Sequence, residues 1–371
     1  MLREATTAAA TVPSARKLGL LMVLGTIAAV LLLLAAAEVA VRVRQYLKYG
    51  STATLEEQFT VDPAIRLRIP VAGYSRGPVS VNRLGFRGDE IAVPKPANTI
   101  RVAFLGASTT WCAEVSSNER VWAYLVTAQL REAFPRKQID YINAGVPGYT
   151  MESILASLKN RVAPLGPDIV VIYEASNNLT GEMRHLAAQR GIVADDQFRD
   201  LSWPSRYSLL WHLVEKNLKL LAAERIAQNP TARLEVDART LGEHYRAVLT
   251  EVVREAQRHA KVVALATFSI QPRREQTQQQ KMQASSSALY YMPFLHPDTV
   301  IAAFERYNEI AREVARDTGA LLIEGERDIP GDAAHFHDTV HFTDAGSAAM
   351  AGRVGRALIA SDAVRAVVGQ Q

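Results

Sequence analysis

Short apolar segments rich in β-branched residues recur along the chain from residue 99 onwards. They are TIRVAFLG (99–106), IDYINAG (139–145), DIVVIYEA (168–175), KVVALATF (261–268) and ALLIE (320–324). Segments with apolar residues at helical spacing lie between them, over 120–134, 150–165, 237–260 and 297–318. Apolar strands that alternate with amphipathic helices predict a parallel sheet covered on both faces. We therefore expect a three-layer α/β/α sandwich over residues 98–362.

A different pattern occupies the N-terminus, where Leu18 to Ala37 run for twenty residues without a charge. At about 1.5 Å per residue, such a helix matches the hydrocarbon thickness of a bilayer. We expect a transmembrane helix over 18–41, after a short tail (1–17), that acts as an uncleaved signal anchor. The alternative is a cleavable signal peptide, because AAAEVA (35–40) offers small residues at a cleavage point.

The basic residues that flank this apolar run give little information on orientation. They are nearly balanced: Arg3, Arg16 and Lys17 precede it, and Arg42, Arg44 and Lys48 follow it. We expect the N-terminus inside the cell and the body of the protein outside the cytoplasm, as a single-pass membrane protein. The lipid bilayer is then a partner through residues 18–41.

Three segments do not fit the strand and helix pattern. Residues 42–97 contain several prolines and glycines, which indicates a linker followed by irregular structure. Residues 179–236 and 271–296 are long insertions at the ligand-binding end of the expected sheet, and the second begins as a polar stretch expected to be a loop. Insertions at this end are typically lids or substrate walls, and the alternative is a peripheral helical hairpin.

Composition excludes some classes of function. The net charge is only +4 and the 42 basic residues are dispersed, without the basic and aromatic clusters typical of nucleic-acid binding. We therefore expect no nucleic-acid partner. The single cysteine, Cys112, excludes an intramolecular disulfide framework and any metal site built from several cysteines.

The residues that follow the predicted strands carry groups suited to acyl transfer, because ligands of such sheets bind at the carboxyl ends of the strands. Ser108 follows the first strand and can present a nucleophilic hydroxyl, with its own N–H facing a developing oxyanion. Gly148 can supply a second N–H and Asn177 a side-chain amide. His341 can act as the general base, with Asp338 orienting its ring. Singly, each has an ordinary structural explanation as a helix cap, a turn residue or a loop residue.

Taken together and in this order, the motifs resemble those of the SGNH hydrolases, also called GDSL-type esterases or lipases. FLGAST (104–109) is similar to the nucleophile block, NAGVPGYT (143–150) to the block of the oxyanion glycine, and EASNN (174–178) to the block of the oxyanion asparagine. DTVHFTDAG (338–346) is similar to the last block, and VNRLGFRGDE (81–90) to a segment of membrane-anchored bacterial relatives. The resemblance implies an SGNH (flavodoxin-like) fold and a triad of Ser108, His341 and Asp338. It also implies an oxyanion hole formed by Ser108, Gly148 and Asn177.

Two departures from the family pattern concern the surroundings of these groups. Ala107 stands where the family has an aspartate before the nucleophile, and the third block reads Ala175, Ser176, Asn177, Asn178 instead of Gly-x-Asn-Asp. Three outcomes stay open: altered substrate choice, low activity, or a degenerate carbohydrate-binding or scaffold protein on the same fold.

The resemblance implies hydrolysis of an acyl ester, for example an O-acetyl ester, through an acyl-enzyme and without a metal or organic cofactor. With the body outside the cytoplasm, the expected substrate is an ester of a cell-envelope carbohydrate or lipid. Transfer of the acyl group to a sugar hydroxyl is the alternative reaction, and no residue identifies the substrate-binding surface.

The last motif also contains His335 and His337, which these roles do not use. A metal site of three histidines is a chemically allowed alternative, and a solvated loop is the simpler interpretation. Thr343 and Asp344 are expected to begin the closing helix, as its N-cap and an acidic residue of its first turn.

Overall fold

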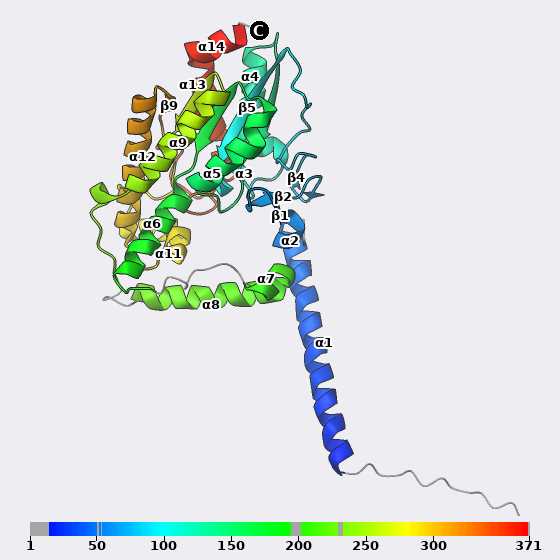
Figure 1. Cartoon of the computed structure of the whole chain (residues 1–371). Coiled ribbons are helices and arrows are strands. Elements are labelled where there is room, and N and C mark those ends of the chain that lie inside the picture. The colour runs from blue at the N-terminus through cyan, green and yellow to red at the C-terminus, as the bar shows by residue number, and fades with distance from the viewer. Residues whose placement is uncertain (1–14, 50–51, 53, 194–201, 229–232, 370–371) are drawn as a thin grey trace, which may run out of the picture.

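The computed structural model describes residues 15–49, 52, 54–193, 202–228 and 233–369. Residues 1–14 of the expected N-terminal tail, and residues 194–201 and 229–232 of the first insertion, lie outside the described residues. The body of the protein is built around one parallel sheet, and a long N-terminal helix projects from it (Figure 1).

The sheet has five parallel strands in the order β6-β5-β7-β8-β9. The strands are β5 (Thr99–Gly106), β6 (Gln138–Asn143), β7 (Ile169–Tyr173), β8 (Val262–Ala266) and β9 (Leu321–Ile323). All residues of β5, β7 and β8 are buried, which requires helices on both faces of the sheet. The predicted three-layer α/β/α sandwich is confirmed.

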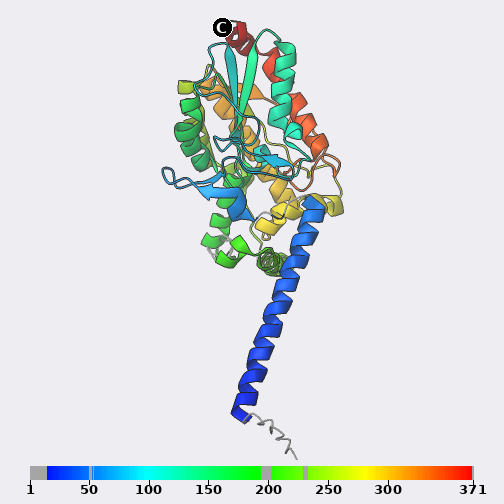
Figure 2. The ribbon, with the colours of Figure 1, turned by 90° about the vertical axis from the view of Figure 1, so that its right-hand side faces the viewer.

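Helices cover the two faces in the way that right-handed crossovers require (Figure 2). One face carries α4 (Trp122–Ala133) and α13 (Asp344–Ala360), which pack against each other. The other carries α5 (Met151–Ser157), α9 (Glu243–His259) and α12 (Pro297–Thr318). The remaining α-helices of the body are α3 (Ser108–Trp111), α6 (Ser176–Gln189), α7 (Trp203–Tyr207), α8 (Leu209–Gln228), α10 (Gln278–Ala284), α11 (Ser286–Tyr291) and α14 (Asp362–Gly369).

Two predicted helices are interrupted. The helix expected over 150–165 is α5 followed by a π turn (Leu158–Val162) and a 3-10 turn (Ala163–Leu165). The helix expected over 237–260 begins as a 3-10 turn (Ala238–Thr240), and α9 starts only after Gly242. Gly242 has a positive φ of 83°, a conformation that ends helical hydrogen bonding and that other residues rarely adopt.

The second insertion starts as a loop over 271–277, as expected, but its polar stretch then continues as the helix α10. Thr277 accepts a hydrogen bond from the backbone N–H of Gln280, whose side chain pairs with the backbone N–H of Thr277. This capping box begins α10. The signal lay in the sequence as a threonine followed three residues later by a glutamine.

Residues 54–97 are more ordered than the expected linker. The segment contains α2 (Leu55–Gln58) and two antiparallel hairpins, β1 (Phe59–Val61) with β2 (Arg68–Pro70) and β3 (Ser75–Arg76) with β4 (Val79–Ser80). Phe59, Val79 and Phe86 are buried in the common core. The segment is therefore part of the body of the protein.

The long N-terminal helix α1 (Ala15–Tyr49) contains one stretch, Leu18–Leu47, that is long and apolar enough to cross a membrane. None of its most apolar window is buried against the body. By length and composition, the helix fits a membrane span, and its position near the N-terminus also fits a signal sequence.

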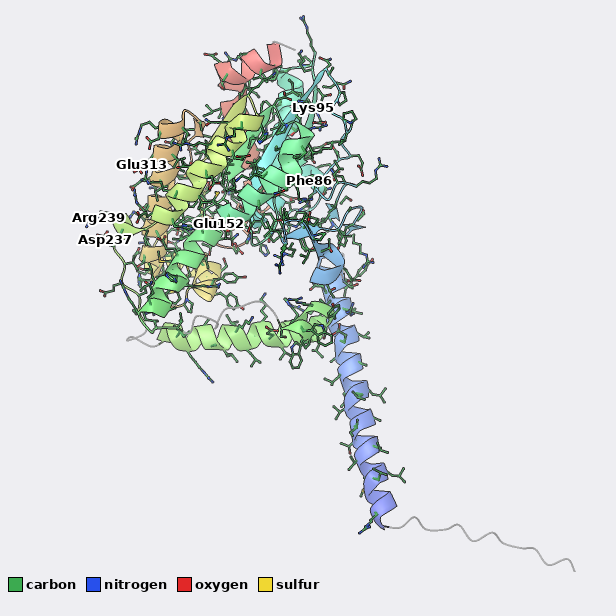
Figure 3. All side chains as sticks on the ribbon, in the orientation of Figure 1. Phe86, Lys95, Glu152, Asp237, Arg239 and Glu313 are labelled. Atoms are coloured by element: carbon green, nitrogen blue, oxygen red, sulfur yellow. The ribbon has the colours of Figure 1, made fainter. Side chains whose placement is uncertain are left out.

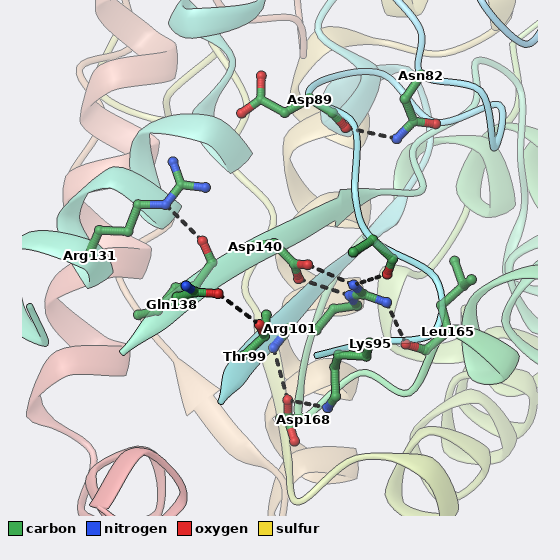
Figure 4. Close-up of polar contacts among 12 residues, drawn as sticks. Asn82, Asp89, Lys95, Thr99, Arg101, Arg131, Gln138, Asp140, Leu165 and Asp168 are labelled. Carbon is green, nitrogen blue, oxygen red and sulfur yellow. Dashed lines mark hydrogen bonds and ion pairs between the residues drawn. The ribbon is translucent and has the colours of Figure 1, made fainter. Parts of the chain in front are cut away.

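Buried ionic contacts hold the amino ends of the strands (Figure 4). The guanidinium of Arg101 in β5 is fully buried, and it donates to both carboxylate oxygens of Asp140 at 2.8 and 2.7 Å. Asp168 accepts from the backbone N–H of Arg101 at 2.9 Å and from Nζ of Lys95 at 2.6 Å. These contacts fix the sheet at the end opposite to the one described next.

Candidate active site

The predicted site residues come from four segments that meet at the carboxyl edge of the sheet. Ser108 begins α3 directly after β5, and Asn177 lies in the first turn of α6 after β7. Gly148 lies in the loop between β6 and α5, and the loop before α13 contains Asp338 and His341. In Figure 3, Glu152 at the start of α5 marks this edge on the side of α8, and Lys95 marks the opposite edge.

Ser108, His341 and Asp338 form one chain of hydrogen bonds. The Oγ of Ser108 is 2.9 Å from Nε2 of His341. Nδ1 of His341 is 2.8 Å from Oδ2 and 3.0 Å from Oδ1 of Asp338. With the proton on Nδ1, the lone pair of Nε2 faces the serine hydroxyl. This arrangement allows the imidazole to accept the proton of Ser108.

The loop itself fixes the acidic member of this chain. Oδ1 of Asp338 also accepts hydrogen bonds from the backbone N–H groups of Val340 and His341, both at 3.0 Å. An aspartate whose carboxylate accepts from the backbone N–H groups two and three residues later forms a local turn. The short spacing between Asp338 and His341 therefore brings the carboxylate beside the imidazole ring.

The pKa values of His341 and Asp338 are shifted in opposite directions. Burial by itself would lower the pKa of His341, but its hydrogen bond to Asp338 and the charges of Glu114, Asp338 and Glu174 raise it to about 9. Burial opposes ionisation of Asp338, but its contacts with His341 outweigh this and lower its pKa to about 2. Both shifts favour the ion pair of imidazolium and carboxylate, which is the state formed after proton transfer.

The side chain of Asn177 contacts the loop that contains Gly148. The amide nitrogen Nδ2 of Asn177 donates to the carbonyl oxygen of Tyr149 at 2.9 Å, so the amide lies against the loop that contains Gly148. Gly148 has a φ of 85°, a left-handed conformation that strains residues with a side chain. The N–H of Ser108, as the first residue of α3, has no carbonyl partner within its own helix. These three groups are the donors that the sequence predicts for the oxyanion hole.

The departures from the family pattern are accommodated without loss of these contacts. Ala107 and Ala175 are buried. Asn178 accepts a hydrogen bond from the backbone N–H of Met151 at 2.8 Å through Oδ1, and its Nδ2 donates to Glu152 at 3.3 Å. Asn177 and Asn178 together therefore connect the start of α6 to the loop of Gly148 and the start of α5.

Arg87, which is not one of the predicted site residues, fixes the short helix α3 that begins with Ser108. Arg87, which is fully buried, donates from Nη1 to the carbonyl oxygens of Trp111 at 2.7 Å and Cys112 at 2.5 Å. Cys112 ends α3 in a left-handed conformation, with its N–H bonded to the carbonyl of Ser108. Arg87 belongs to the stretch VNRLGFRGDE, which thereby contributes to the site although it precedes the sheet.

Two carboxylates that act on His341, those of Glu174 and Glu114, were not predicted as site residues from the sequence. Glu174 directly follows β7, is buried, and accepts the backbone N–H of Asn177 at 2.6 Å, and burial raises its pKa to about 8. Oε2 of Glu114 is buried and has no hydrogen-bond partner among the described residues. A glutamate directly after an apolar strand was a detectable signal for Glu174. Nothing in the sequence distinguished Glu114, because its position depends on the loop after α3.

The two further histidines do not join this chain. His335 pairs with Asp332 at 2.8 Å, and His337 is exposed and contacts the loop through its backbone N–H, which donates to the carbonyl of His341 at 2.8 Å. Within the part of the chain that the structure describes, no three His, Cys, Asp or Glu side chains are arranged to hold a metal ion. Thr343 caps α13 as predicted, since its side chain accepts the N–H of Gly346 at 3.3 Å.

A cavity of about 970 Å³ lies beside the loop after α3. Its polar lining includes Asp89, Glu114, Ser116, Asn118, Glu119 and His337. His337 lines the cavity and its N–H bonds the carbonyl of His341, so the cavity lies next to the loop that contains Asp338 and His341. It is large enough for a small organic ligand with several hydroxyl groups.

Known proteins resemble the chain at the level of family and of structure. LAE5, an alpha/beta hydrolase from the metagenome of Lake Arreo, Spain, has 19% identity and a TM-score of 0.42, with 70% of this chain and 94% of that chain covered. Axe2, an acetylxylan esterase from Geobacillus stearothermophilus, has 17% identity and a TM-score of 0.42, with 72% and 96% covered. Among curated proteins, none matches the sequence.

The family comparison is decisive, because it covers well over half of the sequence. Residues 104–349 match the GDSL-like Lipase/Acylhydrolase family, and this range contains all the predicted site residues. The chain therefore belongs to the GDSL-like lipase/acylhydrolase family and is a hydrolase of carboxylic esters.

Proposed function

We propose that this protein is a membrane-anchored serine esterase that removes an acyl group, for example an acetyl group, from a cell-envelope carbohydrate or lipid. Ser108 is the nucleophile, His341 the general base and Asp338 the residue that orients it. The observation that carries the proposal is the chain of hydrogen bonds from Ser108 through His341 to Asp338, at 2.9 and 2.8 Å.

The reaction proceeds through an acyl-enzyme. His341 takes the hydroxyl proton of Ser108 while Oγ attacks the ester carbonyl carbon, and the oxyanion is stabilised by the N–H groups of Ser108 and Gly148 and the amide of Asn177. The intermediate then expels the alcohol, which receives its proton from His341. Water, activated by the same histidine, attacks the acyl-enzyme and releases the acid.

Two features support the choice of substrate and location. The polar cavity beside Glu114 and His337 suits a hydroxyl-rich alcohol better than a hydrocarbon chain. The apolar stretch of α1 is long enough to span a membrane, and as a signal anchor with the N-terminus in the cytoplasm it would hold the body outside it. The esterase then reaches ester groups of the cell envelope.

Fluorophosphonate labelling of the full chain tests this proposal, because the reagent modifies only activated serines. Wild type should be labelled at Ser108, as mass spectrometry of the labelled peptide would show, and His341→Ala should lose the labelling. His335→Ala is the matched control and should be labelled as wild type, because His335 pairs with Asp332 and has no contact with Ser108. Absence of labelling in folded wild type would favour the degenerate binding protein.

Glu114 should set the pH at which the esterase becomes active. Its negative charge raises the pKa of His341, and the histidine must be neutral to accept the proton of Ser108. Glu114→Gln should therefore move the acid limb of kcat/KM for a soluble aryl acetate to lower pH.

The control for this shift is Glu119→Gln, which removes an exposed carboxylate from the same cavity. Glu119 is not among the groups that act on His341, so the acid limb should stay in place. An unchanged acid limb in Glu114→Gln would contradict the assignment of this charge.

A further inference from the structure

The helices α7 and α8 form an arm, residues Trp203–Gln228, that crosses α1 at the base of the body (Figures 1 and 2). The side chain of Glu38 in α1 caps the start of α8: its carboxylate accepts from Oγ of Ser208 at 2.8 Å and from the N–H groups of Leu209 at 3.1 Å and Leu210 at 2.9 Å. Arg42 donates to the carbonyl of Tyr207 at 3.2 Å. These contacts hold the arm at one level along α1.

That level coincides with the end of the apolar run of α1. The charge-free residues Leu18 to Ala37 would span about 30 Å as a helix, the thickness of the hydrocarbon core. Glu38 follows directly, so in a bilayer spanned by α1 it would lie at the headgroup level. The arm that Glu38 caps lies at the same level, with the body on one side and the apolar length of α1 extending to the other (Figure 1).

The arm exposes apolar side chains in a stripe over its two helices. Its members, Trp203, Tyr207, Trp211, Val214, Leu218 and Leu221, are all exposed and follow one another at spacings of three and four residues. Side chains at these spacings within a helix share one face. On the opposite side Ala223 is buried, so α8 is apolar on both sides. A soluble protein seldom exposes such a stripe without a partner.

We propose that this stripe lies in the headgroup layer of the membrane that α1 spans, so that the arm is an interfacial helix. The inference rests on the membrane anchor in the proposed function. Tryptophan and tyrosine, which make up the half of the stripe nearest α1, are the residues that favour this layer. Arg225, which is exposed and follows Leu221 by four residues on the same helix, suits anionic headgroups.

The arm also places the candidate active site relative to the membrane. α8 packs against α11, in which Oγ of Ser287 accepts the N–H of Thr339 and the N–H of Ala288 donates to Oγ1 of Thr339, both at 3.2 Å. Thr339 is adjacent to Asp338. Because the carboxyl edge of the sheet faces the arm (Figure 3), the esterase would act on esters held at the membrane surface.

Tryptophan fluorescence tests the position of the arm in the full chain. Of the four tryptophans, Trp111 and Trp122 are buried in the body, whereas Trp203 and Trp211 are 72% and 49% exposed on the arm. In vesicles of phosphatidylcholine and phosphatidylglycerol, brominated acyl chains should lower the emission about twofold, because the arm tryptophans lie at the acyl–headgroup boundary. A variant with Trp203→Phe and Trp211→Phe should show no quenching by brominated lipid.

Charge in the stripe should lift the arm out of the membrane. Leu218→Glu combined with Leu221→Glu should abolish the quenching by brominated lipid and make the tryptophans accessible to aqueous iodide. The matched control is Leu220→Glu, since Leu220 is 40% exposed on the same helix but does not share the spacing of the stripe. This variant should keep the quenching.

Other results would overturn the inference. Quenching of the wild-type arm by iodide and not by brominated lipid would place the stripe in water. Protection from both quenchers, with a dimer captured by cross-linking, would show that a second copy covers it. Fluorophosphonate labelling and alkaline extraction of the same vesicles separate these failures from failure of the esterase or of the anchor.

Discussion

Replacing Ser108 with alanine should lower kcat/KM for a soluble aryl acetate by roughly 10⁴- to 10⁶-fold, the loss expected when a serine nucleophile is removed from such a triad. The physical reason is that no other hydroxyl lies within hydrogen-bond distance of Nε2 of His341 in the part of the chain that the structure describes. The residual rate would come from the oxyanion donors and binding alone. Folding should be unaffected, because the Ser108 side chain bonds only the histidine.

The control for Ser108→Ala is Ser75→Ala. Ser75 is an exposed serine of the β3–β4 hairpin whose hydroxyl contacts Ser80, and its loss should leave the rate within about twofold, as for most surface substitutions. Initial rates at several substrate concentrations give the comparison. An active Ser108→Ala enzyme would exclude the proposed acyl-enzyme.

Replacing Asp338 with asparagine should lower kcat by about 10⁴-fold, because an amide no longer selects the tautomer of His341 that leaves Nε2 free to accept a proton. The same change removes the main group that raises the pKa of His341 to about 9. The histidine then becomes neutral at lower pH, so the acid limb of the residual kcat/KM should move to lower pH. A pH–rate profile of wild type and variant measures both effects.

The loop itself supplies the control for Asp338→Asn. Asp332 pairs with His335 at the same spacing, with Oδ1 2.8 Å from Nδ1 and further bonds to the backbone of Ala334 and His335. Asp332→Asn therefore makes the same chemical change in the same kind of turn without a contact to Ser108. Equal losses in the two variants would mean that the loop, and not the tautomer of His341, limits the rate.

Asp338 and His341 also contribute to the pH dependence of stability, with opposite signs. The pKa of His341 is raised on folding, so its contribution is complete below the unfolded value and is lost as the pH rises through about 9. The pKa of Asp338 is lowered, so its contribution is present above the unfolded value and is lost as the pH falls through about 2. The pair therefore stabilises the folded protein at neutral pH.

Local sequence was sufficient for the strands of the sheet and for the choice of candidate site residues. Strand β5 and helix α12 both have the predicted bounds, because continuous apolar runs and helical periodicity are local properties. The motif order also selected Ser108, Gly148, Asn177, Asp338 and His341, and the structure brings the serine, histidine and aspartate into one hydrogen-bonded chain. Their roles in catalysis stay predictions that the variants above test.

Other features depended on contacts between distant segments. The charge states of Glu174 and His341 arise from burial and from neighbours brought close by folding, so no spacing in the sequence could give them. Residues 54–97 were expected to be irregular, but they form short hairpins. These hairpins are stabilised by packing of residues such as Phe59 and Phe86 into a core formed by later segments, which the local sequence does not reveal.

By itself, the sequence determined that this protein has an apolar N-terminal helix and an α/β body with the motifs of an ester hydrolase. Periodicity, segment length and motif order are properties of the linear sequence and need no knowledge of tertiary contacts. Only the tertiary structure decided where the first insertion lies. The apolar residues of α8 lie on two sides of the helix, one toward the protein and one toward solvent. The contacts of α8 with α1 and α11 decide which side faces the protein. Which apolar side of a helix is buried depends on the segment that packs against it, and that segment is determined by the tertiary structure.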